Sequence, residues 1–351
     1  MILADVTTTS GERMAIAHDA HEPNGSLSAG SAAGHTDAGP PSSGPDATRR
    51  HPVRRLSFVC AAAAAAAAAL FVVTVNTTAG QLIGGLILGG RPIDPATSKG
   101  AGQILSVVSA YTVGVGLVII IAIGLLQERP RLALMATGAV VAANLTTQLL
   151  KELVLQRTDL LDHLFYPLPN SYPSGHATAA ASLAVGLILV VPPLARPFVT
   201  IATAIGVALV AVSTLLLGWH RMADAIGGVS VATAWGAGLA AVLAWRRGIE
   251  VVGRRTAAIG RISGGMAMAI GLVAVLVGGS LYVLVAVDPL DVLLHLAERG
   301  GSPALFLLGV IVTVGACIVA LGGLAFALRD IRLDPPVPPN TTTLAQRNGR
   351  D

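Results

Sequence analysis

Charged residues are scarce in this chain. Asp, Glu, Lys and Arg make up 12% of its 351 residues, whereas hydrophobic residues make up 53%. That balance is too apolar for a water-soluble domain of this length. The scarcity of charge therefore excludes the soluble globular classes and predicts a protein embedded in a bilayer.

Cysteine is nearly absent as well. Cys60 and Cys317 both fall inside predicted spans, with no other metal-ligating side chain nearby, so we expect buried, inert thiols and no structural disulfide. The formal charge of +4 would suit a nucleic-acid partner. The basic residues, however, cluster in short loops between apolar runs rather than along one face, so no nucleic-acid partner is predicted.

Long apolar runs dominate what is present. A helix needs about 20 apolar residues to cross roughly 30 Å of hydrocarbon, and eight runs come close to or exceed that length. They lie at 57–75, 104–127, 132–150, 177–194, 198–217, 225–245, 265–287 and 304–328. We therefore predict an all-α fold, a polytopic integral membrane helical bundle.

The chain begins with a polar segment. Its composition, rich in Ala, Gly, Ser, Pro, Asp and Thr, predicts a disordered tail over 1–56, in which the scattered histidines are solvated. The basic flank and the nine alanines of 61–69 that follow also suit a secretory signal peptide. The length of the run and of the preceding tail favours an uncleaved first span. A second disordered tail is predicted at 329–351.

Basic residues recur on alternate sides of the predicted spans. Arginines flank the first span and occupy every second loop, including the basic loop 246–264, whereas the loops near 76–103, 151–176, 218–224 and 288–303 hold fewer. The positive-inside rule therefore predicts that both termini are cytoplasmic and that these four loops are extracytoplasmic.

The strongest local motif is the segment Tyr-Pro-Ser-Gly-His at 172–176, directly before an apolar run. Ser174 can donate a hydroxyl hydrogen bond, Gly175 can let its amide approach an anion, and the helix start adds its positive dipole end. Together they predict a phosphate cradle, with His176 placed to protonate a leaving oxygen. A helix-capping serine in an ordinary turn is the alternative interpretation.

A second motif places His220 four residues before Asp224. If this segment is helical, both side chains lie on one face, where the carboxylate can fix the imidazole tautomer and stabilise its positive charge. The alternative is an interfacial histidine beside an acidic residue at a helix start.

These segments resemble the type-two phosphatidic acid phosphatase family, the membrane branch of the superfamily of bacterial acid phosphatases and vanadium haloperoxidases. The family pattern is Lys, six residues, Arg-Pro; then Pro-Ser-Gly-His; then Ser-Arg, five residues, His, three residues, Asp. The order of the parts is the same here, across roughly 104–245.

The resemblance implies a role for each matching residue. His220 would be the nucleophile that forms a phosphohistidine, Asp224 its orienting carboxylate, and His176 the general acid. Phosphate oxygens would be held by Lys151, Arg157, Ser174, the Gly175 amide and, by adjacency to His220, Arg221. No metal and no cofactor is implied.

Two departures from the family pattern stand out. Five residues rather than six separate Lys151 from Arg157, so this segment must unwind for both side chains to reach one phosphate, and Thr158 replaces proline. Thr214 replaces an arginine, which removes a bidentate phosphate contact worth roughly 1.5 to 3 kcal/mol. Arg221 could supply the missing charge.

We therefore expect a six-span phosphatase core at 57–245, two additional transmembrane helices within 265–328, and a lipid phosphate or polyprenyl diphosphate as substrate in a cell membrane. Membrane lipids are its other expected partners. The alternatives are a non-catalytic binding or transport protein for lipid phosphates, motivated by Thr214, and a plain scaffold. Arg91 and His163 are expected to be solvated loop residues, and His295 has no assigned role.

Overall fold

The apolar runs fold into helices in the computed structural model, which describes residues 45–161, 170–286, 295, 299 and 301–335. The order of elements is α1 (Pro45–Leu70), η1 (Phe71–Val75), α2 (Thr78–Gly89), α3 (Pro95–Val107), α4 (Ala110–Leu126), α5 (Pro130–Leu149), η2 (Leu150–Val154), α6 (Gly175–Val190), α7 (Arg196–Leu216), α8 (Met222–Arg247), β1 (Ile249–Val251), α9 (Arg254–Ala286), α11 (Pro303–Ala327) and β2 (Ile331–Leu333). The two η elements are single π-helical turns. The predicted all-α class is confirmed, apart from this short two-stranded ribbon.

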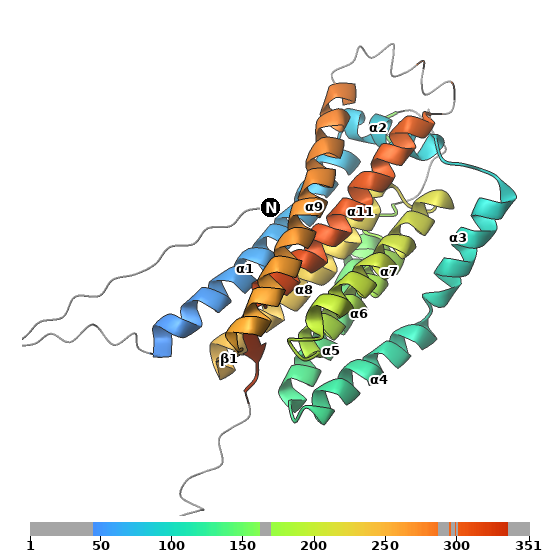
Figure 1. The fold of residues 1–351 in the computed structure, drawn as a ribbon. Coiled ribbons are helices and arrows are strands. Elements are labelled where there is room, and N and C mark those ends of the chain that lie inside the picture. Colours follow the sequence, from blue (N-terminus) through green and yellow to red (C-terminus); the bar gives the residue numbers. More distant parts are fainter. Residues whose placement is uncertain (1–44, 162–169, 287–294, 296–298, 300, 336–351) are drawn as a thin grey trace, which may run out of the picture. The chain divides into compact units, whose positions relative to one another are not determined.

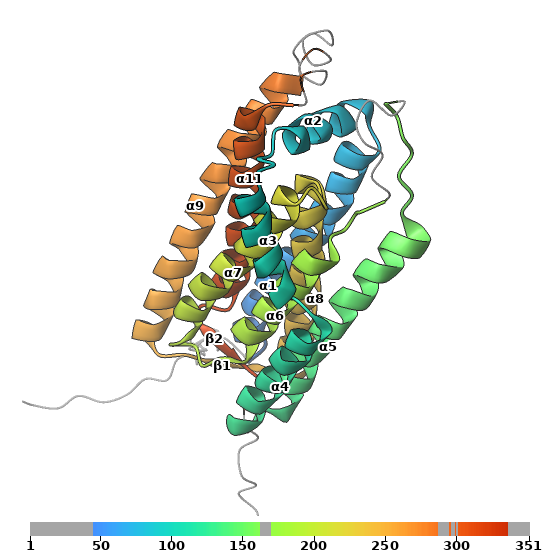
Figure 2. The same cartoon turned by 90° about the vertical axis from the view of Figure 1, so that its right-hand side faces the viewer.

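Helix α8 lies in the middle of the bundle. It packs against α1, α5, α6 and α11, while α9 lies along α11 and α4 lies outside α5 (Figures 1 and 2). In the most apolar 18-residue stretch of α8, 72% of the residues are buried. The corresponding share is 6% in the span that contains α1 and 17% in the span Arg254–Ser280 of α9. Small residues fill its inner faces, which lets neighbouring helices approach closely.

The described helices give fewer spans than the eight predicted. Six are long and apolar enough to cross a membrane, and a seventh is obtained if α3 and α4, which are bent by 48°, count as one broken span. The predicted span at 177–194 forms α6, which has only 16 residues because it ends before Pro192 and Pro193. The arrangement of α9 and α11 as two additional helices beside a separate six-span core stays a prediction.

Several predicted boundaries also need correction. Helix α1 begins at Pro45, so the end of the predicted disordered tail is helical, and α9 begins at Arg254, inside the predicted loop 246–264. The predicted loop 76–103 contains α2 and most of α3. Residues 1–44, His163 and 336–351 lie outside the described residues.

Basic residues from five segments gather at one end of the bundle. Arg55 pairs with Asp330 at 2.6 Å, and Arg129 pairs with Glu250 at 3.0 Å. The buried Arg196 donates from Nη1 to the Leu328 carbonyl at 2.5 Å. Strands β1 and β2 pair antiparallel here. The grouping of these loops on one side, which the charge pattern predicts, is therefore observed.

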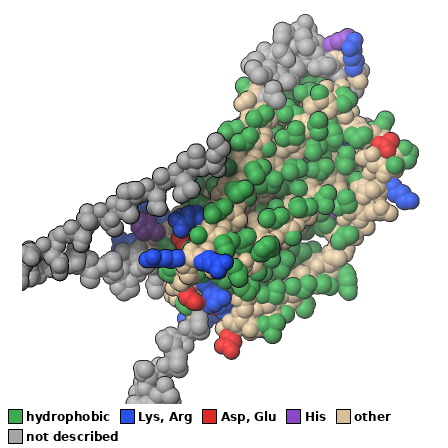
Figure 3. Space-filling model, viewed as in Figure 1, with side chains coloured by type: hydrophobic (Ala, Val, Ile, Leu, Met, Phe, Trp, Pro, Cys, Tyr) green, Lys and Arg blue, Asp and Glu red, His purple; other side chains and the backbone are tan. Residues whose placement is uncertain are grey.

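The flank of the bundle is apolar. Figure 3 shows hydrophobic side chains over most of the visible helical surface, with charged side chains gathered mainly toward its ends. Helix α7 exposes Phe198, Ile201, Ile205 and Leu209, and each of them is at least half exposed. Such a surface is stable against lipid rather than water.

Candidate functional site

Four helix ends meet at the end of the bundle opposite the basic cluster. They are the end of α5, the start of α6, the end of α7 and the start of α8. The Ser174 amide donates to the Asp224 carbonyl at 2.9 Å, which ties the start of α6 to the start of α8. Two helix N-termini, each with unpaired amides and a positive dipole end, therefore converge where the sequence predicts an anion site.

A pair of glycines in α8 permits this close approach. A Cβ atom on Gly228 would lie 2.5 Å from the Ser174 carbonyl oxygen, and one on Gly227 would lie 2.5 Å from the Tyr172 ring. Tyr172 precedes Pro173 across a cis peptide bond and is itself buried. The sequence analysis did not single out these glycines, because glycine pairs are common in packed membrane helices.

Asp224 is fully buried and held by three groups. Its Oδ2 accepts hydrogen bonds from the Ser171 hydroxyl at 2.6 Å and the Arg221 amide at 2.9 Å, and it lies 3.6 Å from Nδ1 of His220. The last distance exceeds an ordinary hydrogen bond, but such contacts often shorten when substrate binds. The carboxylate is therefore fixed in place beside the imidazole.

The pairing of His220 with Asp224 does not arise from a shared helical face, as the spacing suggested. Helix α8 begins only at Met222, so His220 lies in the preceding turn. That turn is closed by the Thr214 carbonyl, which accepts from the amides of Trp219 at 3.0 Å and His220 at 3.3 Å. The irregular turn, rather than helical periodicity, brings the imidazole back over the first turn of α8.

Thr214 lies inside the protein rather than at the site. It is 0% exposed, and its hydroxyl donates to the Ala211 carbonyl at 2.7 Å. Its backbone shapes the turn that carries His220, while its side chain offers nothing to a phosphate. The arginine expected at this position from the resemblance is thus replaced by a buried residue.

His176 is the second residue of α6. Its ring lies 5.7 Å from the Trp219 ring, centroid to centroid, and the charges of His220 and Lys151 are near enough to act on it. Ser174 is fully buried and caps α6, since its Oγ accepts from the Ala177 amide at 3.4 Å. Its hydroxyl proton remains available, so the capping interpretation and the cradle interpretation are compatible.

The segment from Lys151 to Arg157 leaves the helix, as its five-residue spacing requires. Lys151 lies in the π-helical turn η2, and Leu155 is already extended, with φ −97° and ψ 125°. The Asn170 side chain donates to the carbonyls of Lys151 at 3.0 Å and Leu155 at 2.7 Å. Asn170 thereby joins this segment to the chain that enters the Pro-Ser-Gly-His motif.

Arg157 and Arg221 line one pocket of about 320 Å³ with Asp224 and parts of η1 and α2. Arg221 is buried, and its Nε and Nη1 have no hydrogen-bond partner. Burial, reinforced by the positive charge of Arg157, lowers the pKa of Arg221 to about 10. Burial also lowers the pKa of Arg157, although Asp224 and Asp159 oppose this effect. Two crowded guanidinium groups of this kind favour binding of an anion.

Residues 103–248 match the model of the PAP2 superfamily. The chain carries a PAP2 superfamily domain. The family suggests phosphatase activity on a phosphate ester, and the matched domain belongs to a chain with six or seven candidate membrane spans among its described residues. No curated protein and no solved structure matches the chain.

The PAP2 domain contains all eight residues that the sequence analysis proposed for the site, and the structure gathers them at one end of the bundle. They are not equivalent, however. Arg157, Arg221 and Asp224 line the pocket. The other five residues do not: His220, His176, Lys151, Ser174 and Gly175. Asp224 stands between the two groups, because it holds the turn of His220 and also acts electrostatically on both arginines.

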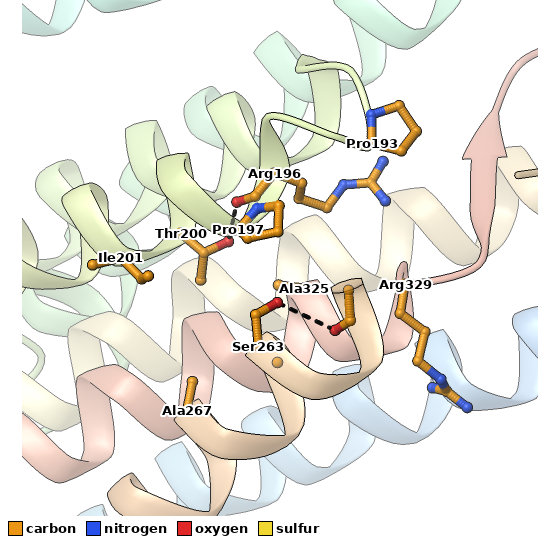
Figure 4. A pocket seen from close by; sticks show the side chains of 11 residues that line it. Pro193, Arg196, Pro197, Thr200, Ile201, Ser263, Ala267, Ala325 and Arg329 are labelled. Carbon is orange, nitrogen blue, oxygen red and sulfur yellow. Dashed lines mark hydrogen bonds between the residues drawn. The ribbon is translucent and has the colours of Figure 1, made fainter. Parts of the chain in front are cut away.

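A larger cavity lies outside this site. It has a volume of about 360 Å³ and is lined by α7, α9 and α11 near the basic end (Figure 4). Arg196 borders it, but its guanidinium already donates to the carbonyls of Ile188, Leu328 and Ile331. Its lining includes arginines but neither a histidine nor a carboxylate, so it lacks the buried carboxylate that the candidate site contains.

Proposed function

We propose that this PAP2 protein is a metal-independent phosphatase that removes phosphate from a lipid phosphate or polyprenyl (di)phosphate at the extracytoplasmic membrane face. The proposal depends chiefly on one observation, the 3.6 Å approach of His220 Nδ1 to a buried carboxylate that two hydrogen bonds hold in place. An imidazole oriented in this way keeps its other nitrogen free as a nucleophile.

The first half of the reaction transfers phosphate to the protein. Nε2 of His220 attacks phosphorus, and the bond between phosphorus and the alcohol or phosphate leaving oxygen breaks. His176 gives its proton to that oxygen, and Asp224 stabilises the positive imidazole through Nδ1–H. The products are the dephosphorylated lipid, or the monophosphate if a diphosphate entered, and a phosphohistidine.

The second half releases inorganic phosphate. His176, now neutral, takes a proton from water as that water attacks phosphorus, and the bond between phosphorus and His220 breaks. Arg157, Arg221 and Lys151, with the Ser174 hydroxyl and the Gly175 amide, hold the phosphate oxygens and offset their growing charge. Arg221 supplies the guanidinium that the family pattern expects at position 214.

The location of the site suits a substrate anchored in lipid. The candidate site lies at one end of an apolar bundle, and the basic cluster at the other end marks the cytoplasmic side by the positive-inside rule. A phosphate that projects from the outer leaflet could enter this site while its hydrocarbon tail stays in the bilayer.

Replacement of the nucleophile tests the proposal. In detergent, His220→Ala should lower phosphate release from diacyl or polyprenyl phosphates by at least about a thousandfold, by analogy with loss of a catalytic nucleophile, and EDTA should not inhibit the parent protein. The exposed His51, at the basic end, gives a matched control, and His51→Ala should be fully active. Activity that survives in His220→Ala, or that vanishes with EDTA, would contradict the mechanism.

A non-catalytic lipid-phosphate binding or transport protein is the second candidate, and the burial of Thr214 in place of an arginine favours it. Such a protein would bind the lipid phosphate without releasing inorganic phosphate. The same assay separates the two candidates, since only an enzyme has a turnover that vanadate or His220→Ala can remove.

A further inference from the structure

Gln81 connects α2 to the segment that carries Arg157. Its side chain is 3% exposed and forms hydrogen bonds with three backbone groups. Nε2 donates to the carbonyls of Val75 at 2.8 Å and Thr158 at 2.6 Å, and Oε1 accepts from the Leu160 amide at 3.2 Å. The carboxamide nitrogen must face the two carbonyls and its oxygen must face the amide, so these three partners fix the orientation of the side chain.

Two of these bonds fall directly after Arg157. Residues 155–160 have no helical or strand structure of their own, and Thr158, Asp159 and Leu160 are exposed. An exposed segment of this kind can adopt many backbone conformations. Without a restraint, the guanidinium of Arg157 would therefore occupy many positions. The family pattern would place a proline at 158, and its ring would restrict the backbone there. Thr158 lacks that restriction. The hydrogen bonds of the Gln81 carboxamide restrain the backbone there instead.

Helix α2 also supports the second guanidinium. A Cβ atom on Gly84 would lie 3.4 Å from Cδ of Arg221, so this face of α2 contacts the aliphatic stem of that side chain. Gly80 and Gly84 line the same pocket as Arg157 and Arg221. Helix α2 precedes the PAP2 domain, which begins at residue 103.

We propose that Gln81 is a positioning residue for Arg157, which it holds at the anion pocket from outside the PAP2 domain. The role rests on the proposed function, in which Arg157 binds the substrate phosphate. Gln81 itself touches backbone atoms and acts only through the arginine.

A pair of glutamine variants tests this role. Gln81→Leu removes the three contacts at similar volume. Gln127→Leu is the matched control, because Gln127 also donates to two carbonyls, those of Val190 at 2.6 Å and Ile123 at 3.3 Å, but at the junction of α4 and α5. Gln81→Leu should raise KM for the lipid phosphate and lower kcat/KM by about tenfold to a hundredfold, the cost of one weakened charge-assisted hydrogen bond. Gln127→Leu should leave kcat/KM unchanged.

The double variant separates positioning from general stability. In an Arg157→Ala background, Gln81→Leu should change kcat/KM less than about twofold, since the group it positions is already gone. A loss of kcat/KM that is equally large with and without Arg157, or equal in Gln127→Leu, would overturn the role.

A readout without turnover keeps the inference separate from the proposed phosphatase activity. Trypsin cleaves after arginine, so limited proteolysis followed by mass spectrometry reports how freely the Arg157–Thr158 bond moves. Gln81→Leu should speed cleavage at this bond at least about tenfold relative to Gln127→Leu, as release of a local clamp would. Equal cleavage rates would overturn the clamp even if the protein is an active phosphatase, and faster cleavage would support it even if the parent protein releases no phosphate.

Discussion

At the scale of single residues, Asp224 is the centre of the site. It lies 3.6 Å from the His220 imidazole and lines one pocket with Arg157 and Arg221, and hydrogen bonds from a side chain and from backbone fix it. The spacing of His220 and Asp224 predicts their proximity, but an irregular turn rather than a shared helical face produces it. Ser171 could not be predicted, because a lone serine before a proline turn carries no pattern, and only the fold brings it to 2.6 Å from the carboxylate.

Ser171→Ala should lower kcat by about tenfold, since a charge-assisted hydrogen bond of about 1.5 kcal/mol no longer holds the carboxylate. Ser182 is a matched control, because it is also buried and its hydroxyl is hydrogen-bonded away from Asp224, donating to the Ala179 carbonyl and accepting from Asn144 Nδ2, both at 3.0 Å. Thermal unfolding and steady-state kinetics of both variants check this. If Ser182→Ala lost as much activity as Ser171→Ala, the effect would be one of stability alone.

At the scale of elements, the site depends on where helices begin and end. Apolar runs predict most helices well, but they do not reveal the break at Val108 and Ser109. Ser109 caps α4 there through a hydrogen bond from the Thr112 amide. Ser109 and Thr112 are small polar residues and hardly change the hydropathy of the run. Helix α2 was also missed, since its 12 residues are too few to span a bilayer and read as part of a loop.

The contact between α6 and α8 gives a prediction at this scale. Gly228→Ala would place Cβ 2.5 Å from the Ser174 carbonyl and 2.8 Å from Thr178 Oγ1, so the start of α6 must shift. We expect a loss of about 1 to 3 kcal/mol in stability and at least about a tenfold loss of activity as His176 moves.

Gly206→Ala in α7 is the control for this substitution, because nothing lies within 4 Å of its added Cβ. It should be neutral or raise the free energy of unfolding by about 0.5 to 1 kcal/mol, through the higher helix propensity of alanine. Chemical denaturation measures both variants. A neutral Gly228→Ala would show that the helices are not packed as closely as described.

At the scale of the whole molecule, the two ends of the bundle differ in chemistry. One end collects arginines bound to carboxylates and backbone carbonyls, and the other collects His176, His220, Asp224 and the pocket. Loop charge could predict which loops share an end. Contacts between distant segments, such as Arg55 with Asp330 or Gln81 with Thr158, have no signal in a single sequence, because they depend on the folded arrangement.

The membrane orientation is tested by labelling exposed positions near each end. In a background where Cys60 and Cys317 are replaced by alanine, a membrane-impermeant maleimide should label Gln156→Cys on intact cells. It should reach Gly253→Cys only after permeabilisation, because the positive-inside rule predicts that the basic end faces the cytoplasm. Labelling in the reverse order would place the site inside the cell.

The most direct test of the central claim is to trap the covalent intermediate. A lipid substrate with a radiolabelled phosphate, mixed with the protein and quenched within the first turnover, should leave a label on the peptide that contains His220. That label should be stable in base and lost in acid, as a phosphoramidate is, and it should be absent from His220→Ala. A label on a different residue, or steady turnover in His220→Ala, would contradict the account.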